Sequence, residues 1–318
     1  MAHRIGGALL PHDISPGFQA QSRRFEEHGA KRYGAGPQPW VLSSLLPGLG
    51  PGARVLDVCT GTGQLARSLA AATTDLDPSS AVTGLDVTPG MLAVAKEQEA
   101  VAAAAVAGTA ATPPPPIQWV LGDASSLPFS DNSFDLVTCR LAVHHFVVGD
   151  APGYLAEMAR VCSPGGRVAI VDIVAAEDRP GDAARRLRDE LETLRDPTHV
   201  KVHSRSEIAE LLRNAGLKVH CSAENGTGTM GKAVYPVPLS CEAWFDITAT
   251  DPATRAVVRS HLNAEIAEAA MAVSNQSTKS TTPQPPSTHE TGLRPYYDTN
   301  GDLMFFHDWA VVIGVAPL

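Results

Sequence analysis

Short apolar segments alternate with segments of helical composition through the first part of the chain. The apolar segments are rich in β-branched residues and too short to be buried helices, so each is predicted to be a strand. Strands that alternate with helices are typical of a parallel sheet covered by helices, which makes the predicted fold class α/β. The predicted strands occupy residues 55–58, 81–87, 117–123, 134–139 and 166–172.

The segments next to these strands predict the helices. Gln64–Ala72 follows the first strand, and Met91–Ala107 is rich in alanine, which favours a helix. Asp150–Val161 is predicted to be a helix that Ser163–Gly166 connects to the fifth strand by a turn. Pro39–Leu46 is predicted to be a helix that leads into the first strand.

A charged segment, residues 177–195, follows the fifth strand and has a helical period. Leu187, Leu191 and Leu194 stand at positions i, i+4 and i+7. This spacing places the three leucines on one face of a helix. We therefore expect a solvated helix with a single apolar stripe.

The next elements have clear start signals. Ser204 and Glu207 have the spacing of a capping box, in which the serine caps a helix and the glutamate returns a hydrogen bond. A strand is predicted from Leu217. The segments that begin at Pro238 and Asp251 are interpreted as two further helices.

The last apolar segment, Leu303–Ala316, is predicted to be a strand that joins the sheet begun near residue 55. A final strand that belongs to the first core indicates one domain with insertions. Residues 274–291 are rich in Ser, Thr, Pro and Gln, a composition typical of a flexible loop. The single domain, 1–318, is therefore divided into an N-terminal cap (1–50), a Rossmann-like core (51–235), a helical insertion with a flexible loop (236–291) and a closing strand (292–318).

The most informative stretch is a strand, a glycine turn and a helix around Asp57, Gly61 and Gly63. Such a turn lets the backbone approach a ligand, and the helix N-terminus offers unpaired N–H groups. Asp86 ends the second strand 23 residues after Gly63, close to the ~20 expected for a ribose-binding carboxylate. Two glycines alone also fit a tight turn without a ligand. Successive strands that end in polar residues at one edge favour a ligand site.

Composition narrows the possible partners. Acidic residues outnumber basic ones, 34 to 25, and the formal net charge of −9 argues against a nucleic-acid partner, which favours a basic face. The five cysteines are widely spaced, so we interpret them as buried side chains of an intracellular protein and not as disulfides or a zinc site. No apolar run reaches the ~18–20 residues of a membrane span, and the first residues lack a clear signal peptide. We expect a soluble, cytoplasmic protein.

Four blocks, in order along the chain, carry a family resemblance: Leu56–Gly63, Gly84–Leu92, Gly122–Asp135 and Arg160–Arg167. The chain resembles the class I S-adenosylmethionine-dependent methyltransferases, in particular the small-molecule branch that includes the ubiquinone and menaquinone methyltransferases. The resemblance implies a Rossmann-like, seven-stranded, mostly parallel sheet with helices on both faces and helical lid insertions, among them residues 177–195. It also implies S-adenosyl-L-methionine as cofactor and S-adenosyl-L-homocysteine as product.

The same resemblance implies which residues bind the cofactor. Asp57 would lie near the ammonium group, Asp86 would bind the ribose hydroxyls, and Asp123 would accept from the adenine amino group. Asp123 could instead cap a turn, and Tyr33 could pack on the domain edge. The other implied contacts are Tyr33 in the pocket, Gly61 and Gly63 beside the methionine portion, Val87 and Met91 around adenine, the Ala124 N–H at a ring nitrogen, and the Arg140 carbonyl near the tail.

Histidines are the candidates for acid–base chemistry. Methyl transfer is an in-line displacement, and a hydroxyl acceptor also has to lose a proton, for which histidine is suited near neutral pH. His144 and His145 stand just past the fourth strand, and His199 lies in the loop before the capped helix. We rank His145 first; any one of the three could instead make a structural hydrogen bond. No metal is expected, because the His and Asp spacing lacks a ligand pattern.

The resulting hypothesis is an S-adenosylmethionine-dependent methyltransferase that acts on an O or C atom of a small, apolar or aromatic metabolite, as a monomer or homodimer. A rival hypothesis keeps the cofactor but not methyl transfer, as in a pericyclase on the same fold. The sequence does not separate these two. A third hypothesis, a binding module with a degenerate site, is disfavoured because Asp57, Gly61, Gly63, Asp86 and Asp123 are all intact.

Overall fold

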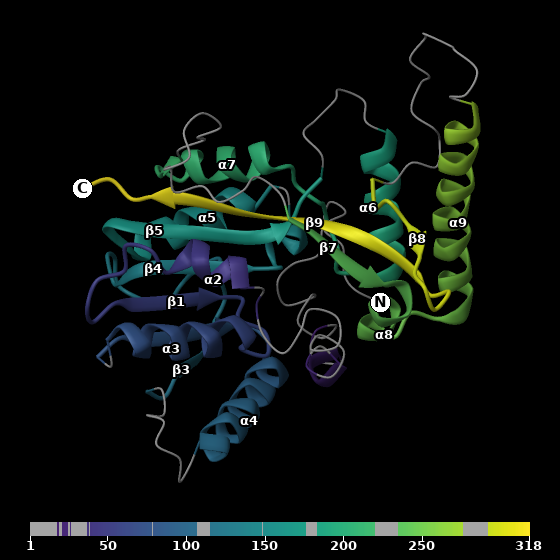
Figure 1. The fold of residues 1–318 in the computed structure, drawn as a ribbon. Helices are drawn as coiled ribbons and strands as arrows, with labels where there is room; N and C mark the ends of the chain where they lie inside the picture. The colour runs from purple at the N-terminus through teal and green to yellow at the C-terminus, as the bar shows by residue number, and fades with distance from the viewer. Residues whose placement is uncertain are drawn as a thin grey trace.

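A twisted β-sheet runs through the centre of the molecule, with helices on both of its faces (Figure 1). The structure is a computed structural model. Tyr33 and most of the predicted loop 274–291 lie outside the described residues. The structure describes residues 18, 21–24, 26, 37, 39–77, 79–106, 115–147, 149–175, 183–219, 235–275 and 292–318.

The first five strands are parallel where they pair, and the sheet continues in the order β3-β2-β1-β4-β5-β9-β6. This path confirms the predicted mostly parallel, Rossmann-like sheet. β7 and β8 are additional, and both pair with β9. The strands are β1 (Arg54–Val58), β2 (Ala81–Asp86), β3 (Gln118–Leu121), β4 (Phe134–Arg140), β5 (Cys162–Ile173), β6 (Lys218–Val219), β7 (Tyr235–Ser240), β8 (Tyr296–Tyr297) and β9 (Leu303–Val315).

Side chains alternate between the two faces of the sheet along each strand, and each face has its own hydrophobic core. Val55 and Leu136 belong to the core that includes helices α2 and α3, whereas Leu56 and Val137 belong to the core that includes α5 and α7. Side chains that follow each other in a strand point to opposite faces, so strands of this kind are apolar throughout. The helices are α2 (Pro39–Leu45), α3 (Gln64–Leu76), α4 (Pro89–Val106), the short 3₁₀ helix η1 (Val143–His145), α5 (Ala151–Val161), α6 (Ala183–Arg195), α7 (Arg205–Asn214), α8 (Cys241–Thr248) and α9 (Pro252–Asn275).

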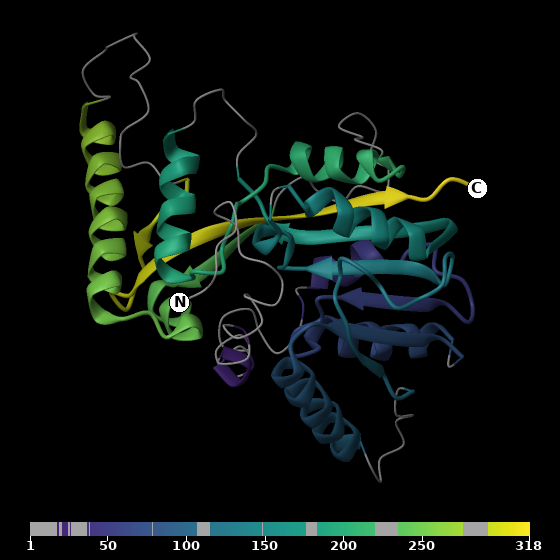
Figure 2. The ribbon, with the colours of Figure 1, turned by 180° about the vertical axis from the view of Figure 1, so that it is seen from behind.

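β9 continues beyond the segment that pairs with β5, and its first half pairs with an additional strand, β7. Residues Trp309–Val315 pair with β5, whereas Met304–Trp309 pair with β7. α6, α8 and α9 gather around this half of β9, as both ribbon views show (Figures 1 and 2). β7 was missed because Pro236 and Pro238 stand within it, and proline is tolerated only in edge strands or at bulges.

Three local predictions differ in outcome. The capping box is confirmed, since the Ser204 side chain accepts from the Glu207 backbone N–H and the Glu207 carboxylate accepts in return. The predicted turn at Ser163–Gly166 lies inside β5, where the register with β4 shifts. Leu194 does not join the predicted apolar stripe, because it is 50% exposed while Leu191 is buried.

No helix within the described part of the chain combines the length and apolar character needed to span a membrane.

Candidate active site

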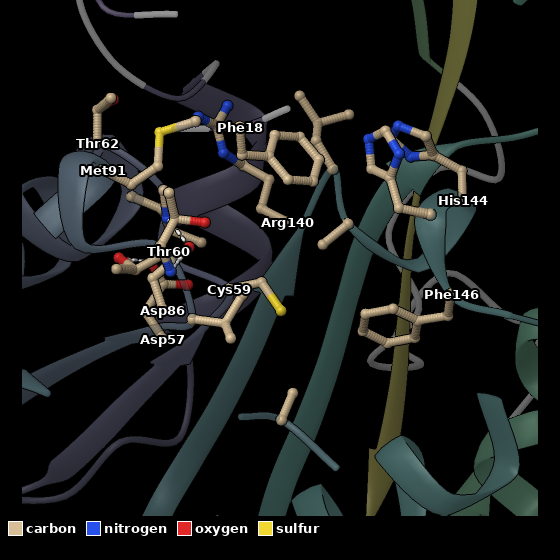
Figure 3. Close-up of a pocket in the computed structure, with 18 of the residues that line it drawn as sticks. Phe18, Asp57, Cys59, Thr60, Thr62, Asp86, Met91, Arg140, His144 and Phe146 are labelled. Atoms are coloured by element: carbon tan, nitrogen blue, oxygen red, sulfur yellow. Dashed lines mark hydrogen bonds between the residues drawn. The ribbon is translucent and has the colours of Figure 1, made fainter. Parts of the chain in front are cut away.

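A cavity of about 210 Å³ opens at the carboxyl ends of the parallel strands. Its walls come from the turns after β1, β2 and β4, from η1, and from α6, α8 and β9. Figure 3 places Asp57, Asp86 and Met91 on one side and His144 and Phe146 on the other, with Phe18 and Arg140 between. Ten of the sequence-predicted residues line it: Asp57, Gly61, Asp86, Val87, Met91, Asp123, Ala124, Arg140, His144 and His145.

The turn after β1 has a left-handed backbone at alternate positions. Cys59, Gly61 and Gly63 have φ values of 55°, 57° and 77°. A left-handed φ is costly for a residue with a Cβ. Cys59 nevertheless adopts this backbone conformation, which a glycine at the same position would adopt without strain. A Cβ at Gly61 would meet no atom within 4 Å, which leaves the backbone there open to a ligand.

Gly63 lies away from the cavity wall and against a tryptophan ring. It does not line the cavity, and a Cβ at this position would overlap the Trp119 ring. Its left-handed φ and the contact with Trp119 show that glycine is required here for packing at the start of α3. Of the two glycines in this turn, Gly61 borders the cavity.

Asp57 is a buried carboxyl group at the end of β1. Its Oδ2 accepts from Thr60 Oγ1 at 2.7 Å and its Oδ1 from Thr138 Oγ1 at 2.8 Å. Burial raises the pKa of Asp57 to about 6, despite these hydrogen bonds and the nearby charge of Arg140. A buried carboxylate is stabilised by a cation, so this position favours a positively charged ligand group.

Asp86 joins the glycine turn to the end of β2. Its Oδ2 accepts from the Gly61 N–H at 2.8 Å and its Oδ1 from the Thr88 N–H at 2.9 Å. Burial raises the pKa of Asp86. Each oxygen of a carboxylate has two acceptor sites, so Asp86 can also accept from a diol in the cavity.

The remaining predicted cofactor residues lie along the same wall. Val87 and Met91 supply apolar surface, and Asp123 and Ala124 follow β3. Asp123 Oδ1 accepts from the Ser125 N–H at 2.8 Å. This hydrogen bond caps the turn, which is the role that the sequence analysis gave as the alternative to binding adenine. The Arg140 guanidinium donates to Gln64 Oε1 at 3.1 Å, so its side chain reaches this wall.

His144 and Asp172 form a buried pair on the opposite wall. His144 Nδ1 lies 2.6 Å from Asp172 Oδ1. The carboxylate can only accept, so Nδ1 carries a proton, and Nε2 is the nitrogen that Asp172 leaves available. The imidazole lowers the pKa of Asp172 despite its burial. The pair therefore holds the imidazole in a fixed orientation, the arrangement of a general base.

His145 lies beside His144, with ring centroids 4.1 Å apart, but has different partners. Its Nδ1 lies 3.0 Å from the carbonyl oxygen of Thr198, which fixes the proton on Nδ1. Burial, and then the neighbouring His144, lower the pKa of His145 to about 3. An imidazole with so low a pKa is a weak base near neutral pH.

His199 does not reach the cavity. It is buried behind His144, with ring centroids 5.8 Å apart, and its Nε2 lies 3.0 Å from Asp189 Oδ1. Asp189 also accepts from the Val202 N–H at 2.8 Å. The geometry gives His199 a structural contact between α6 and the following loop.

The sequence analysis missed Asp172, which holds His144 but does not itself line the cavity, and several residues that do line it. Asp172 had a signal, because it ends the fifth predicted strand as Asp57 and Asp86 end theirs. The other missed residues had no individual signal, although residues 177–195 were expected to form a lid, because they come from α6, the residue after it, α8 and β9 and meet only in the folded chain. They are Glu192, Arg195, Asp196, Ile247 and His307. Within the described residues, no group of three His, Cys, Asp or Glu side chains is arranged to hold a metal ion.

Comparison with known proteins gives consistent results. A family model described as a methyltransferase domain matches residues 56–170. The methyltransferase YcgJ of Bacillus subtilis, itself uncharacterised, is 30% identical over 66% of this chain and 71% of its own length. Its crystal structure superimposes with a TM-score of 0.59 at 24% identity, covering 84% of this chain and 92% of that one.

Two further relatives have named activities. A 2-phytyl-1,4-naphtoquinone methyltransferase of Synechocystis is 38% identical over 43% of this chain. The match spans only 50% of that enzyme's length. The [4+2]-cyclase SpnF has a TM-score of 0.56 at 17% identity, with 98% of both chains covered. At that identity the likeness concerns the fold alone.

Proposed function

The chain belongs to the S-adenosylmethionine-dependent methyltransferases, and on this premise we propose that it transfers a methyl group to an oxygen or carbon atom of a small, largely apolar or aromatic metabolite. The observation that carries the proposal is the two-sided cavity. Acids at strand ends line one wall, and a His–Asp pair stands on the other beside aromatic and aliphatic side chains.

The cofactor wall fits S-adenosylmethionine in its chemistry. The buried Asp57, with a raised pKa, suits the ammonium group, and Asp86 suits the two ribose hydroxyls. Val87 and Met91 offer the apolar surface that an adenine ring needs, and Gly61 leaves the backbone open. When bound, this cofactor supplies a methyl group on a positively charged sulfur.

The acceptor wall suits an apolar or aromatic compound. Phe146, Ile173 and Ile247 line the cavity there, Phe18 lies between the two walls, and apolar walls exclude water from the reacting groups. We assign the general base to His144 and not to His145, the residue ranked first from the sequence. Asp172 holds the proton on Nδ1, so His144 Nε2 is the atom that would take a proton from an acceptor hydroxyl.

The relatives support a small-molecule acceptor. The Synechocystis relative is named for a naphthoquinone substrate, a flat and mostly apolar ring system. The net charge of −9 is unfavourable for a nucleic-acid substrate. The cyclase SpnF shares the fold, but the His144–Asp172 pair gives methyl transfer the specific support that a pericyclic reaction lacks.

The test is formation of S-adenosylhomocysteine from S-adenosylmethionine with a panel of hydroxylated aromatic acceptors. With an O-acceptor, His144→Gln is expected to lower kcat by about 10²–10⁴-fold, the usual contribution of a general base, while the Kd of S-adenosylhomocysteine stays the same. His145→Gln is the matched control, and its kcat is expected to fall less. Tight cofactor binding without turnover of any acceptor would count against methyl transfer. A larger loss in His145→Gln would reverse the assignment of the base.

A further inference from the structure

Two histidine rings lie side by side on the wall opposite the strand-end acids. His144 and His145 both line the cavity, and their ring centroids are 4.1 Å apart with the ring planes inclined by 42°. Each residue is 8% exposed. Because both rings stand at one point of the wall, an acceptor bound at His144 also meets the ring of His145.

The Nδ1 atoms of both rings are occupied by protein groups. Asp172 accepts from His144 Nδ1, and two oxygens of Thr198 face His145 Nδ1, the carbonyl oxygen at 3.0 Å and Oγ1 at 3.2 Å. Thr198 Oγ1 donates its own proton to Asp196 Oδ1 at 2.6 Å, so toward His145 it can only accept. Nδ1 of His145 therefore carries a proton.

The Nε2 atoms of the same two rings are open. Within the described part of the chain, neither Nε2 is enclosed by protein and neither has a hydrogen-bond partner, whereas His199, His203 and His307 each have a fully enclosed ring nitrogen. Burial, and then the neighbouring His144, lower the pKa of His145 to about 3. With its proton on Nδ1 and so low a pKa, His145 has an unprotonated Nε2 at neutral pH, which can only accept a hydrogen bond.

An acceptor-only nitrogen beside the base distinguishes between substituents next to the reacting atom. When a hydroxyl of the acceptor lies at His144 Nε2, the group on the neighbouring carbon lies at His145, because the two rings are in contact. A hydroxyl or amino group there donates to Nε2. A carbonyl or ether oxygen would instead place a lone pair against a lone pair, and an alkyl group would leave the nitrogen without a partner. Phe18 packs edge-to-face on His145, with ring centroids 5.1 Å apart, so apolar surface borders this ring.

We propose that His145 determines acceptor specificity by accepting, at Nε2, a hydrogen bond from a hydroxyl or amino group on the carbon next to the one that bears the methylated oxygen. This rests on the proposed function, which it extends to a substrate class: aromatic compounds with two adjacent hydrogen-bond donors. It also favours a single methylation, because the methoxy group of the product has no proton to donate to His145.

The test measures binding, so it does not depend on turnover. The full chain, saturated with S-adenosylhomocysteine, is titrated calorimetrically with 2,3-dihydroxynaphthalene, 3-amino-2-naphthol and 3-methyl-2-naphthol. These compounds have the same ring system and nearly the same size, and only the methyl compound lacks the second donor. The two donor compounds are expected to bind about fivefold more tightly than the methyl compound, the value of one hydrogen bond between neutral groups. 3-Methoxy-2-naphthol has a second oxygen but no second donor, and it is expected to bind no better than the methyl compound.

Variants assign the preference to His145. His145→Phe keeps a ring and removes the nitrogen, so the donor compounds and the methyl compound are expected to bind equally. His145→Met tests the same point if the phenylalanine variant does not fold, and His145→Gln, which keeps an acceptor oxygen, is expected to retain part of the preference. His261→Phe is the matched control, because it makes the same substitution on α9, which does not line the cavity, and it should keep the full preference.

The proposal is overturned if the wild type does not prefer the donor compounds, if the methoxy compound binds as tightly as they do, or if the preference survives in His145→Phe or His145→Met. Absence of binding by all four compounds overturns it as well. Failure to form S-adenosylhomocysteine with any acceptor, with the binding preference intact, would instead refute methyl transfer alone.

Discussion

Replacing Asp57 by asparagine separates its effect on cofactor binding from its effect on stability. The side chains have the same shape, and the hydroxyl groups of Thr60 and Thr138 can rotate to pair with an amide. The substitution therefore removes a charge from a buried site and leaves the packing of β1 unchanged.

The structure gives the size and the direction of the change in the free energy of unfolding with pH. Folding raises the pKa of Asp57 from 3.8 to about 6, so the folded state binds the proton more tightly than the unfolded state. The free energy of unfolding of the ligand-free protein is then expected to fall by up to about 3 kcal/mol as the pH rises from about 4 to 6. Asp57→Asn has no carboxyl group to ionise at this position, so its free energy of unfolding does not fall in this way. The variant should therefore be more stable than the wild type at pH 8.

Binding should change in the opposite direction. A ligand ammonium group requires the ionised carboxylate, so the wild type should bind S-adenosylhomocysteine about tenfold more weakly at pH 5 than at pH 8. Asp57→Asn should bind about 30-fold more weakly than the wild type at pH 8, from a loss of roughly 2 kcal/mol. Its remaining pH dependence reports Asp86, whose pKa is also raised.

Calorimetry at pH 5, 6, 7 and 8 measures the binding, and urea unfolding without ligand measures the stability. A variant that is both less stable and weaker in binding would indicate simple structural damage. Wild-type affinity of Asp57→Asn at pH 8, or a wild-type Kd that does not change between pH 5 and 8, would refute the placement of a ligand cation at Asp57.

Two further substitutions test the cofactor wall and the packing of the turn beside it. Asp86→Ala is expected to weaken S-adenosylhomocysteine binding about 100-fold, because two ribose hydrogen bonds to a carboxylate are lost, at roughly 3 kcal/mol in total. The circular dichroism spectrum of this variant should stay native. Unchanged affinity by calorimetry would exclude the ribose role. Gly63→Ala is expected to lower the free energy of unfolding by about 3 kcal/mol, from a strained left-handed backbone and overlap with Trp119. The matched control is Gly48→Ala, which has a similar φ and no atom within 4 Å, so equal losses in the two variants would mean that the Trp119 contact is unimportant.

Sequence reasoning located the elements whose signals are local. The five parallel strands are short apolar runs, and the capping box at Ser204 needs only residues three apart. β7 was missed because its prolines oppose a strand assignment, and its partner, β9, is more than 60 residues away in sequence. The burial of α6 was also misjudged at Leu194, since the helix is anchored by Arg188, Glu192 and Arg195 and not by leucines alone.

The residues of the candidate site also fall into two groups, those located from the sequence and those identified only in the folded structure. The sequence by itself determined the cofactor wall, because the glycine turn and the strand-end acids Asp57 and Asp86 are fixed by short segments of a regular fold. Only the tertiary structure distinguished His144 from its neighbour His145. Adjacent in sequence, they differ in their partners, Asp172 on β5 and Thr198 beyond α6, and a side chain's basicity depends on the groups that folding brings to it.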